Sequence, residues 1–143
     1  MTNLCPCGSK QHYSDCCEPI VSGRRNAVTA QQLMRSRYTA FTLADVDYLL
    51  HSHAVKTRPV KDRKSIERWA KSVVWMGLSI LHTEAGGAND ETGCVEFKAN
   101  FLEKGNPLRF MRNHFSAAKM ASGCMSQDYN SKFFLKTTMK VNC

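Results

Sequence analysis

The chain has 143 residues, of which 43% are hydrophobic and 9% aromatic, and its formal net charge is +8. This length predicts one folded domain with a small additional module, and the apolar content excludes a wholly disordered chain. The longest apolar stretch, residues 73–81, is too short to cross a bilayer, and no signal-peptide pattern opens the chain. We therefore expect a cytoplasmic protein with no membrane partner, whose positive charge favours acidic partners without naming one.

Four of the seven cysteines lie close together near the start of the chain. Cys5, Cys7, Cys16 and Cys17 follow the pattern C-x-C, eight residues, C-C. So dense a group of thiols predicts one tetrahedral site for a single structural Zn²⁺, with four sulfur ligands and no open position for chemistry. Disulfides or unrelated buried thiols are the alternatives, and disulfides would need an oxidising compartment.

A helix is predicted from Thr29, its N-cap, to about residue 42. Its apolar residues fall on one face at helical spacing: Leu33, Met34, Tyr38 and Phe41. Arg35 is expected to point to solvent. Arg37 lies at the edge of the apolar face, within reach of a carboxylate or a bound anion. A second short helix is predicted over residues 44–52.

Residues 56–71 form a basic stretch, with seven Lys or Arg against two Asp or Glu. Apolar residues at helical spacing predict an amphipathic surface helix here, with Ser65 as a possible cap. A nucleic-acid-binding face would combine such charge with exposed aromatic residues or a known module, and neither is present. A solvated helix face is therefore favoured, although nucleic acid is not excluded as a partner.

The second half of the chain alternates with the period of β-strands. Strands are predicted over residues 75–84, 93–103 and 108–115, separated by turns rich in Gly and Asn. In the middle strand, four apolar residues are predicted to point to one side, namely Val95, Phe97, Ala99 and Phe101, and Glu96, Lys98 and Asn100 to the other. Helices followed by an antiparallel meander predict an α+β fold.

No sequence motif of a known catalytic site is present. The chain has no G-x-S-x-G, no glycine-rich phosphate loop and no H-E-x-x-H. Its five histidines have no metal-ligand spacing, and a Cys94–His dyad has no support beyond the two residue types. The sequence leaves open whether the protein is an enzyme, and the lack of these motifs leans against one.

Two stretches resemble known bacterial families. The pattern C-P-C-G-S-x-x-x-Y-x-x-C-C, from Cys5 to Cys17, resembles the SEC-C motif, a zinc module also found at the C-terminus of the translocase motor SecA. The stretch L-M-R-S-R-Y-T-A-F, from Leu33 to Phe41, is similar to the uncharacterised YchJ family. This resemblance implies a SEC-C module over residues 1–22, then a nuclear transport factor two-like (cystatin-like) cone over 23–116, in which helices pack on a curved antiparallel sheet.

The resemblance implies two kinds of function. The first is a zinc-stapled interaction module, or adaptor, that binds a protein partner; by analogy with SEC-C, this partner is a chaperone or the ribosome. The alternative is a small-molecule-binding or catalytic pocket in the cone, with candidate lining residues Arg37, Tyr38, Asp47 and His53.

The family likeness stops near Ser116, and residues 117–143 form a divergent tail that we expect to be poorly ordered. Codons chosen for Ala117 to Ser126 read Ser-Lys-Asn-Gly-Lys-Trp-Leu-Tyr-Val in another frame, which resembles the turn and strand expected there. Our hypothesis is a frameshift near codons 116–118, with a genuinely divergent tail as the alternative. Sequencing the gene tests it, because a locus unable to encode Trp-Leu-Tyr-Val in any frame rules it out.

Overall fold

The computed structural model describes residues 3–53, 60–85, 87, 89, 93–104 and 106–116, with only the backbone described for Cys94 and 106–116. The predictions for the tail, for the start of the basic stretch and for the Cys94 side chain lie outside these residues. The elements, in chain order, are η1 (Tyr13–Asp15), α1 (Glu18–Val21), α2 (Ala30–Leu43), α3 (Val46–His51), η3 (Val60–Asp62), α4 (Arg63–Ser72), β1 (Val73–Ala85), β2 (Gly93–Glu103) and β3 (Asn106–Ser116).

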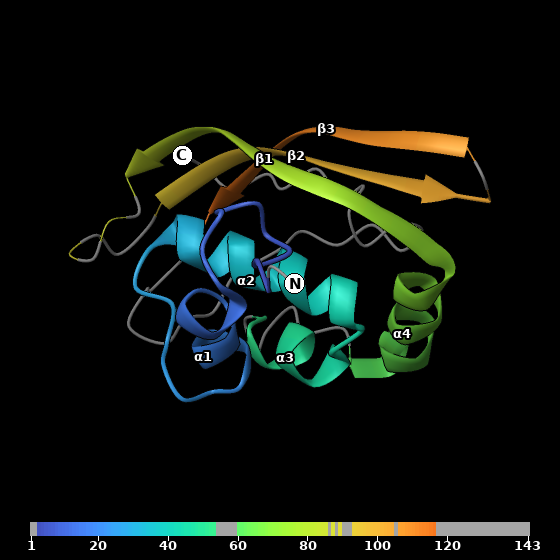
Figure 1. Ribbon diagram of the computed structural model, residues 1–143, viewed down its shortest axis with the longest axis horizontal. Coiled ribbons are helices and arrows are strands. Elements are labelled where there is room, and N and C mark those ends of the chain that lie inside the picture. The colour runs from blue at the N-terminus through green and yellow to red at the C-terminus, as the bar shows by residue number, and fades with distance from the viewer. Residues whose placement is uncertain are drawn as a thin grey trace.

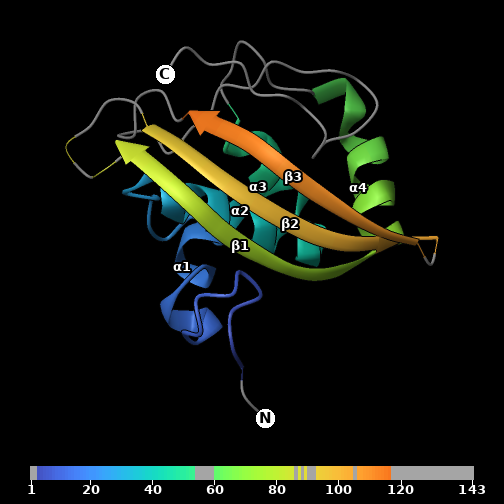
Figure 2. The same ribbon diagram turned by 90° about the horizontal axis from the view of Figure 1, so that it is seen from above.

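The three strands form one curved antiparallel sheet in the order β1-β2-β3. Leu78 of β1 pairs with Ala99 of β2, which pairs in turn with Phe110 of β3. All the labelled helices lie on one side of this sheet, with α2 nearest to it and α1 and α3 beyond (Figures 1 and 2). The predicted α+β fold, with helices packed on a curved antiparallel sheet, is confirmed.

Helix α2 is capped at both ends by hydrogen bonds from or to neighbouring residues. The Thr29 hydroxyl accepts a hydrogen bond from the Gln32 backbone N–H at 3.1 Å, so Thr29 is the N-cap that the sequence predicts. At the other end, Ala44 takes a left-handed conformation (φ 54°, ψ 34°) and its N–H bonds to the carbonyls of Ala40 and Phe41. The predicted apolar face of α2 is buried, and so are the four apolar residues predicted to share one side of β2.

An aromatic cluster joins α2, α4, β1 and β2. Ring centroids lie 5.5–6.1 Å apart, in edge-to-face or tilted arrangements that favour aromatic pairs. The members are Tyr38, Phe41, Trp69, Trp75 and Phe101. Two indole N–H groups also donate hydrogen bonds, from Trp69 to the Glu103 carboxylate at 3.1 Å and from Trp75 to the Ala70 carbonyl at 3.2 Å. This cluster fixes α4 against the end of the sheet at which β1 begins.

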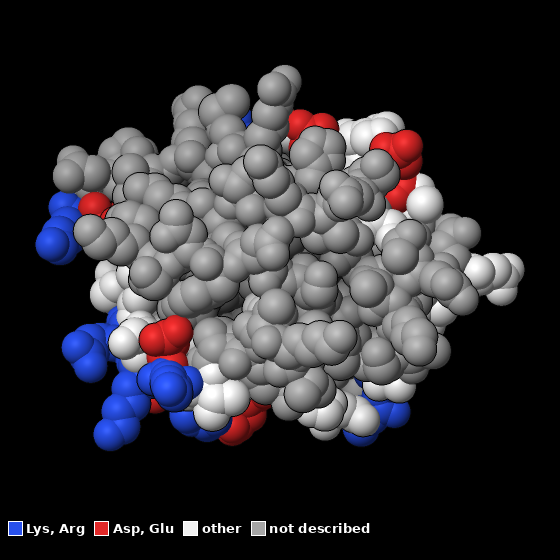
Figure 3. Space-filling view, turned by 180° about the vertical axis from the view of Figure 1, so that it is seen from behind, with Lys and Arg blue, Asp and Glu red and all other residues white. Residues whose placement is uncertain are grey.

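Helix α4 is the amphipathic helix predicted for the basic stretch, but Ser65 is not its cap. The helix begins earlier, at Arg63, and its N-cap residue Asp62 makes no side-chain capping bond. Ion pairs link Lys71 to Glu67 at 2.5 Å and Arg63 to Asp47 at 2.6 Å. Viewed from behind, basic and acidic side chains lie beside one another at the α4 end of the molecule, as on a solvated helix face (Figure 3). Among the helices described, none combines the length and apolar character required to cross a bilayer.

Candidate metal centre

Residues 3–17 fold back on themselves and bring four cysteines together. An isolated β-bridge pairs Leu4 with His12, and the Cys5 N–H donates to the Gln11 carbonyl at 2.8 Å. The turn between them passes through Gly8, whose φ of +77° favours glycine. A Cβ at this position would lie 3.0 Å from the Leu78 carbonyl of β1, so the turn also sits too close to the sheet for a side chain.

The four thiol sulfurs occupy one compact cluster. They belong to Cys5, Cys7, Cys16 and Cys17, and all lie within 4.8 Å of one another. The Cys16 sulfur is 3.6 Å from that of Cys7 and 3.8 Å from that of Cys17. Disulfide sulfurs lie about 2.05 Å apart, so these four cysteines are free thiols. Bonds of about 2.3 Å to a central zinc in a tetrahedron would place sulfurs roughly 3.8 Å apart, close to the separations of the Cys16 sulfur from those of Cys7 and Cys17.

The protonation of the thiols reflects their crowding. The pKa of Cys7 is lowered because Cys17 and Cys5 hydrogen-bond to its sulfur, with further bonds from the Ser9 hydroxyl and backbone N–H. The pKa of Cys17 is raised by its hydrogen bonds to Cys5 and Cys7 and by burial. Burial raises the pKa of Cys16 to about 11. Without a cation, the cluster therefore retains protons that a bound metal would displace.

Helix α2 contacts the cysteine cluster through two side chains. An Arg35 guanidinium nitrogen donates to the Cys7 carbonyl oxygen at 2.6 Å, and the Thr39 hydroxyl lies 3.7 Å from the Cys5 sulfur. The prediction that Arg35 points to solvent is therefore wrong. Arg35 and Thr39 are one helical turn apart, so they share a face. The spacing of Arg35 and Thr39 could have shown that they lie on the same face of α2. It could not have shown that this face contacts the cysteine loop, which is distant in the sequence.

The donor set fits a metal that prefers soft ligands. Four thiols converge, three of them buried, and thiolates select zinc or similar metals over Mg²⁺ or Ca²⁺. When bound, such an ion would be held by Cys5, Cys7, Cys16 and Cys17. Four protein ligands leave no position for a reacting water, so the chemistry supplied there is structural.

The four residues predicted to line a pocket in the cone differ in burial and in the groups that they contact. Arg37 is buried and donates to the Leu49 carbonyl at 2.9 Å and to the Ser52 hydroxyl, near the C-terminal end of α3. Tyr38 and His53 are also buried, and burial raises the pKa of Tyr38 to about 12. Asp47 is largely exposed and paired with Arg63. Tyr38 and Asp47 line different cavities, so a shared binding role for these residues stays a prediction.

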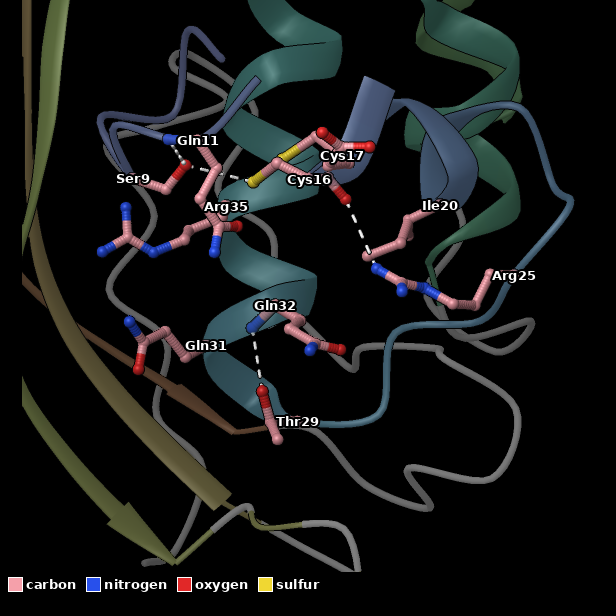
Figure 4. Close-up of a pocket in the computed structure, with 11 residues that line it drawn as sticks. Ser9, Gln11, Cys16, Cys17, Ile20, Arg25, Thr29, Gln31, Gln32 and Arg35 are labelled. Carbon is pink, nitrogen blue, oxygen red and sulfur yellow. Dashed lines mark hydrogen bonds between the residues drawn. The ribbon is translucent and has the colours of Figure 1, made fainter. Parts of the chain in front are cut away.

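A cavity of about 390 Å³ lies beside the cysteine cluster (Figure 4). Its lining comes from the cysteine loop, from α1 and the segment after it, and from the first half of α2. The polar and sulfur-bearing residues that line it are Ser9, Gln11, Asp15, Cys16, Cys17, Arg25, Thr29, Gln31, Gln32 and Arg35. The sequence gives no direct signal for this cavity, because it forms where three separate segments meet.

Comparison with known structures supports this architecture. A solution structure of a SEC-C motif containing protein from Rhodopseudomonas palustris matches with a TM-score of 0.67 at 32% identity, over 79% of this chain and 84% of that one. A crystal structure of a SEC-C motif containing protein from Psychrobacter arcticus matches with a TM-score of 0.70 at 26% identity, over 91% of this chain and 75% of that one.

Proteins of similar sequence belong to the same family as the one that the sequence patterns suggest. A UPF0225 protein of Geobacter sulfurreducens is 48% identical over 105 residues, which are 73% of this chain and 65% of the relative, so the chain spans less than two thirds of that protein. A UPF0225 protein of Pectobacterium carotovorum is 37% identical over 123 residues, covering 80% of this chain and 79% of the relative. Residues 1–19 match the SEC-C motif, and residues 29–120 match the model described as "YchJ, middle NTF2-like domain". The chain therefore belongs to the YchJ family, with an N-terminal SEC-C motif joined to an NTF2-like domain.

Proposed function

We propose that this protein is a cytoplasmic zinc-binding adaptor, whose SEC-C loop binds one Zn²⁺ and presents its outer surface to a protein partner. The observation that carries the proposal is the cluster of four thiols within 4.8 Å, braced on α2. One Zn²⁺ and four thiolates would make this loop rigid, and a rigid loop binds a partner with a smaller entropic cost than a mobile one.

The outer surface of the loop is available for contact. The buried sulfurs of Cys5, Cys7 and Cys17 face inward, while Leu4, Pro6, Lys10, Gln11 and His12 are exposed. Leu4 has 47% of its surface exposed, an apolar group at the edge of a polar patch. A chaperone or the ribosome is the partner proposed by analogy with SEC-C, and the positive charge of the chain leaves nucleic acid open.

The alternative function, a pocket in the cone, has less support. Its candidate Arg37 is already hydrogen-bonded to α3, and the described core beneath the sheet is filled by apolar side chains from Leu33 to Phe101. We therefore favour the adaptor over an enzyme.

Affinity capture from cell extract, followed by rebinding of each purified candidate, tests the adaptor. The intact protein is compared with Cys5→Ser, which removes one ligand, and with Arg24→Ala, which removes an exposed charge and leaves the four thiols intact. We expect a partner that rebinds directly to the intact protein and to Arg24→Ala, but not to Cys5→Ser. Equal rebinding to all three would show that the metal loop is not the docking element.

A further inference from the structure

The four cysteines differ in their access to solvent. Cys5, Cys7 and Cys17 are 5%, 0% and 1% exposed, whereas Cys16 is only partly buried. Of the four, Cys16 and Cys17 line the cavity shown in Figure 4, whereas Cys5 and Cys7 are not part of its lining. A small molecule that enters this cavity therefore meets the Cys16 sulfur with less obstruction than any other.

The cysteines also differ in how they are held. Cys5 contacts Thr39 and the Cys7 carbonyl accepts from Arg35, both on the 14-residue helix α2. On the cavity side, the Ser9 hydroxyl lies 3.2 Å from the Cys16 sulfur, and Arg25, an exposed residue, donates to the Cys16 carbonyl at a long 3.5 Å. Ser9 belongs to the same short loop as the metal ligands, so the support of Cys16 is local.

The walls of the cavity suit water and small polar ligands. Asp15 contributes a carboxylate that attracts a cation, and Arg25 and Arg35 contribute guanidinium groups that attract the anionic groups of a chelator. Gln31 and Gln32 lie opposite the cysteines on the first turns of α2. A polar opening lets an incoming ion or chelator replace water without the cost of desolvating an apolar channel.

We propose that this cavity is the route by which the metal exchanges with solution, and that Cys16 is the ligand that opens first. This inference rests on the metal binding proposed above. It gives the cavity a role in metal loading, with hydrated Zn²⁺ and small polar chelators as the ligands it admits.

Filling the cavity tests the route. Gln31→Trp places a large side chain in the wall, and Arg24→Trp, outside the lining, is the matched control. Zn²⁺ uptake and release to a chromophoric chelator are followed by stopped-flow absorbance. We expect Gln31→Trp to slow uptake and release alike by about tenfold and to leave the Kd within about twofold, because a barrier to passage acts on both directions. Unchanged rates, or a change in release alone with a weakened Kd, would overturn the route.

Alkylation of the unmodified, zinc-loaded chain tests the order of opening without relying on a variant. With iodoacetamide, a cysteine sulfur forms a bond to the CH₂ carbon and iodide leaves. Peptide mass spectrometry over time should find Cys16 modified about tenfold faster than Cys5, Cys7 or Cys17. Modification of any of these three at the same rate as Cys16 or faster would refute the order. A chain that takes up no Zn²⁺ would overturn both proposals, whereas a loaded chain that fails these two tests would overturn only this one.

Discussion

The hydrogen bonds of Arg37 decide between two roles for this residue, in stability and in ligand binding. Its buried guanidinium donates to the Leu49 carbonyl and the Ser52 hydroxyl, close to the negative end of α3. Arg37→Ala should lower the free energy of unfolding by about 2–3 kcal/mol, because it leaves buried acceptors without a charged donor. Urea denaturation measures this, and Arg63→Ala, in an exposed ion pair, should cost less than about 1 kcal/mol.

A near-zero loss of stability for Arg37→Ala, together with loss of binding to a small anion, would show instead that Arg37 binds a ligand.

Arg35 shows which contacts of a single residue can be predicted from the sequence and which cannot. The apolar stripe predicts which side of α2 is buried. The bond from Arg35 to Cys7, however, spans 28 positions, and no local pattern encodes such a pairing.

At the scale of elements, the end of α2 offers a test of backbone strain. Ala44 has a φ of 54°, in the left-handed region that a Cβ disfavours. Ala44→Gly should raise the free energy of unfolding by about 0.5–1 kcal/mol, since relief of strain exceeds the added entropy of the unfolded chain. Thermal melts of this variant measure the effect, and Ala30→Gly, in the first turn of the same helix, should destabilise instead. Destabilisation by both changes would mean that the Ala44 methyl packs more favourably than its strain costs.

The elements themselves were largely predictable. Alternation predicted β2 because one face is buried and the other is not, and the Thr29 cap predicted the start of α2. Ser65 was wrongly predicted to cap α4, because the helix begins two residues earlier and continues directly from the 3₁₀ turn η3, which ends at Asp62. The cavity beside Cys16 was not predictable, because its walls come from segments separated in sequence.

For the whole molecule, the question is whether the metal loop folds separately. The boundary at residue 22 stays a prediction, but one continuous core contains Cys5, Cys7, Cys17 and Ile20 together with Leu33 and residues of the sheet. Removal of the metal should therefore lower the melting temperature of the whole chain, by roughly 10 °C if binding contributes a few kcal/mol. Calorimetry with and without chelator measures this shift, and Cys5→Ser should melt at one temperature in both conditions. An unchanged main transition would show instead that the loop unfolds by itself.

The metal content of the purified protein decides whether the four cysteines hold one zinc ion. Protein purified under reducing conditions is analysed by mass spectrometry for zinc and for protein on the same sample, beside Cys5→Ser and Arg24→Ala. We expect one Zn²⁺ per chain in the intact protein and in Arg24→Ala, and well under one in Cys5→Ser. Well under one equivalent of any metal in the intact protein, or equal zinc in Cys5→Ser, would contradict it.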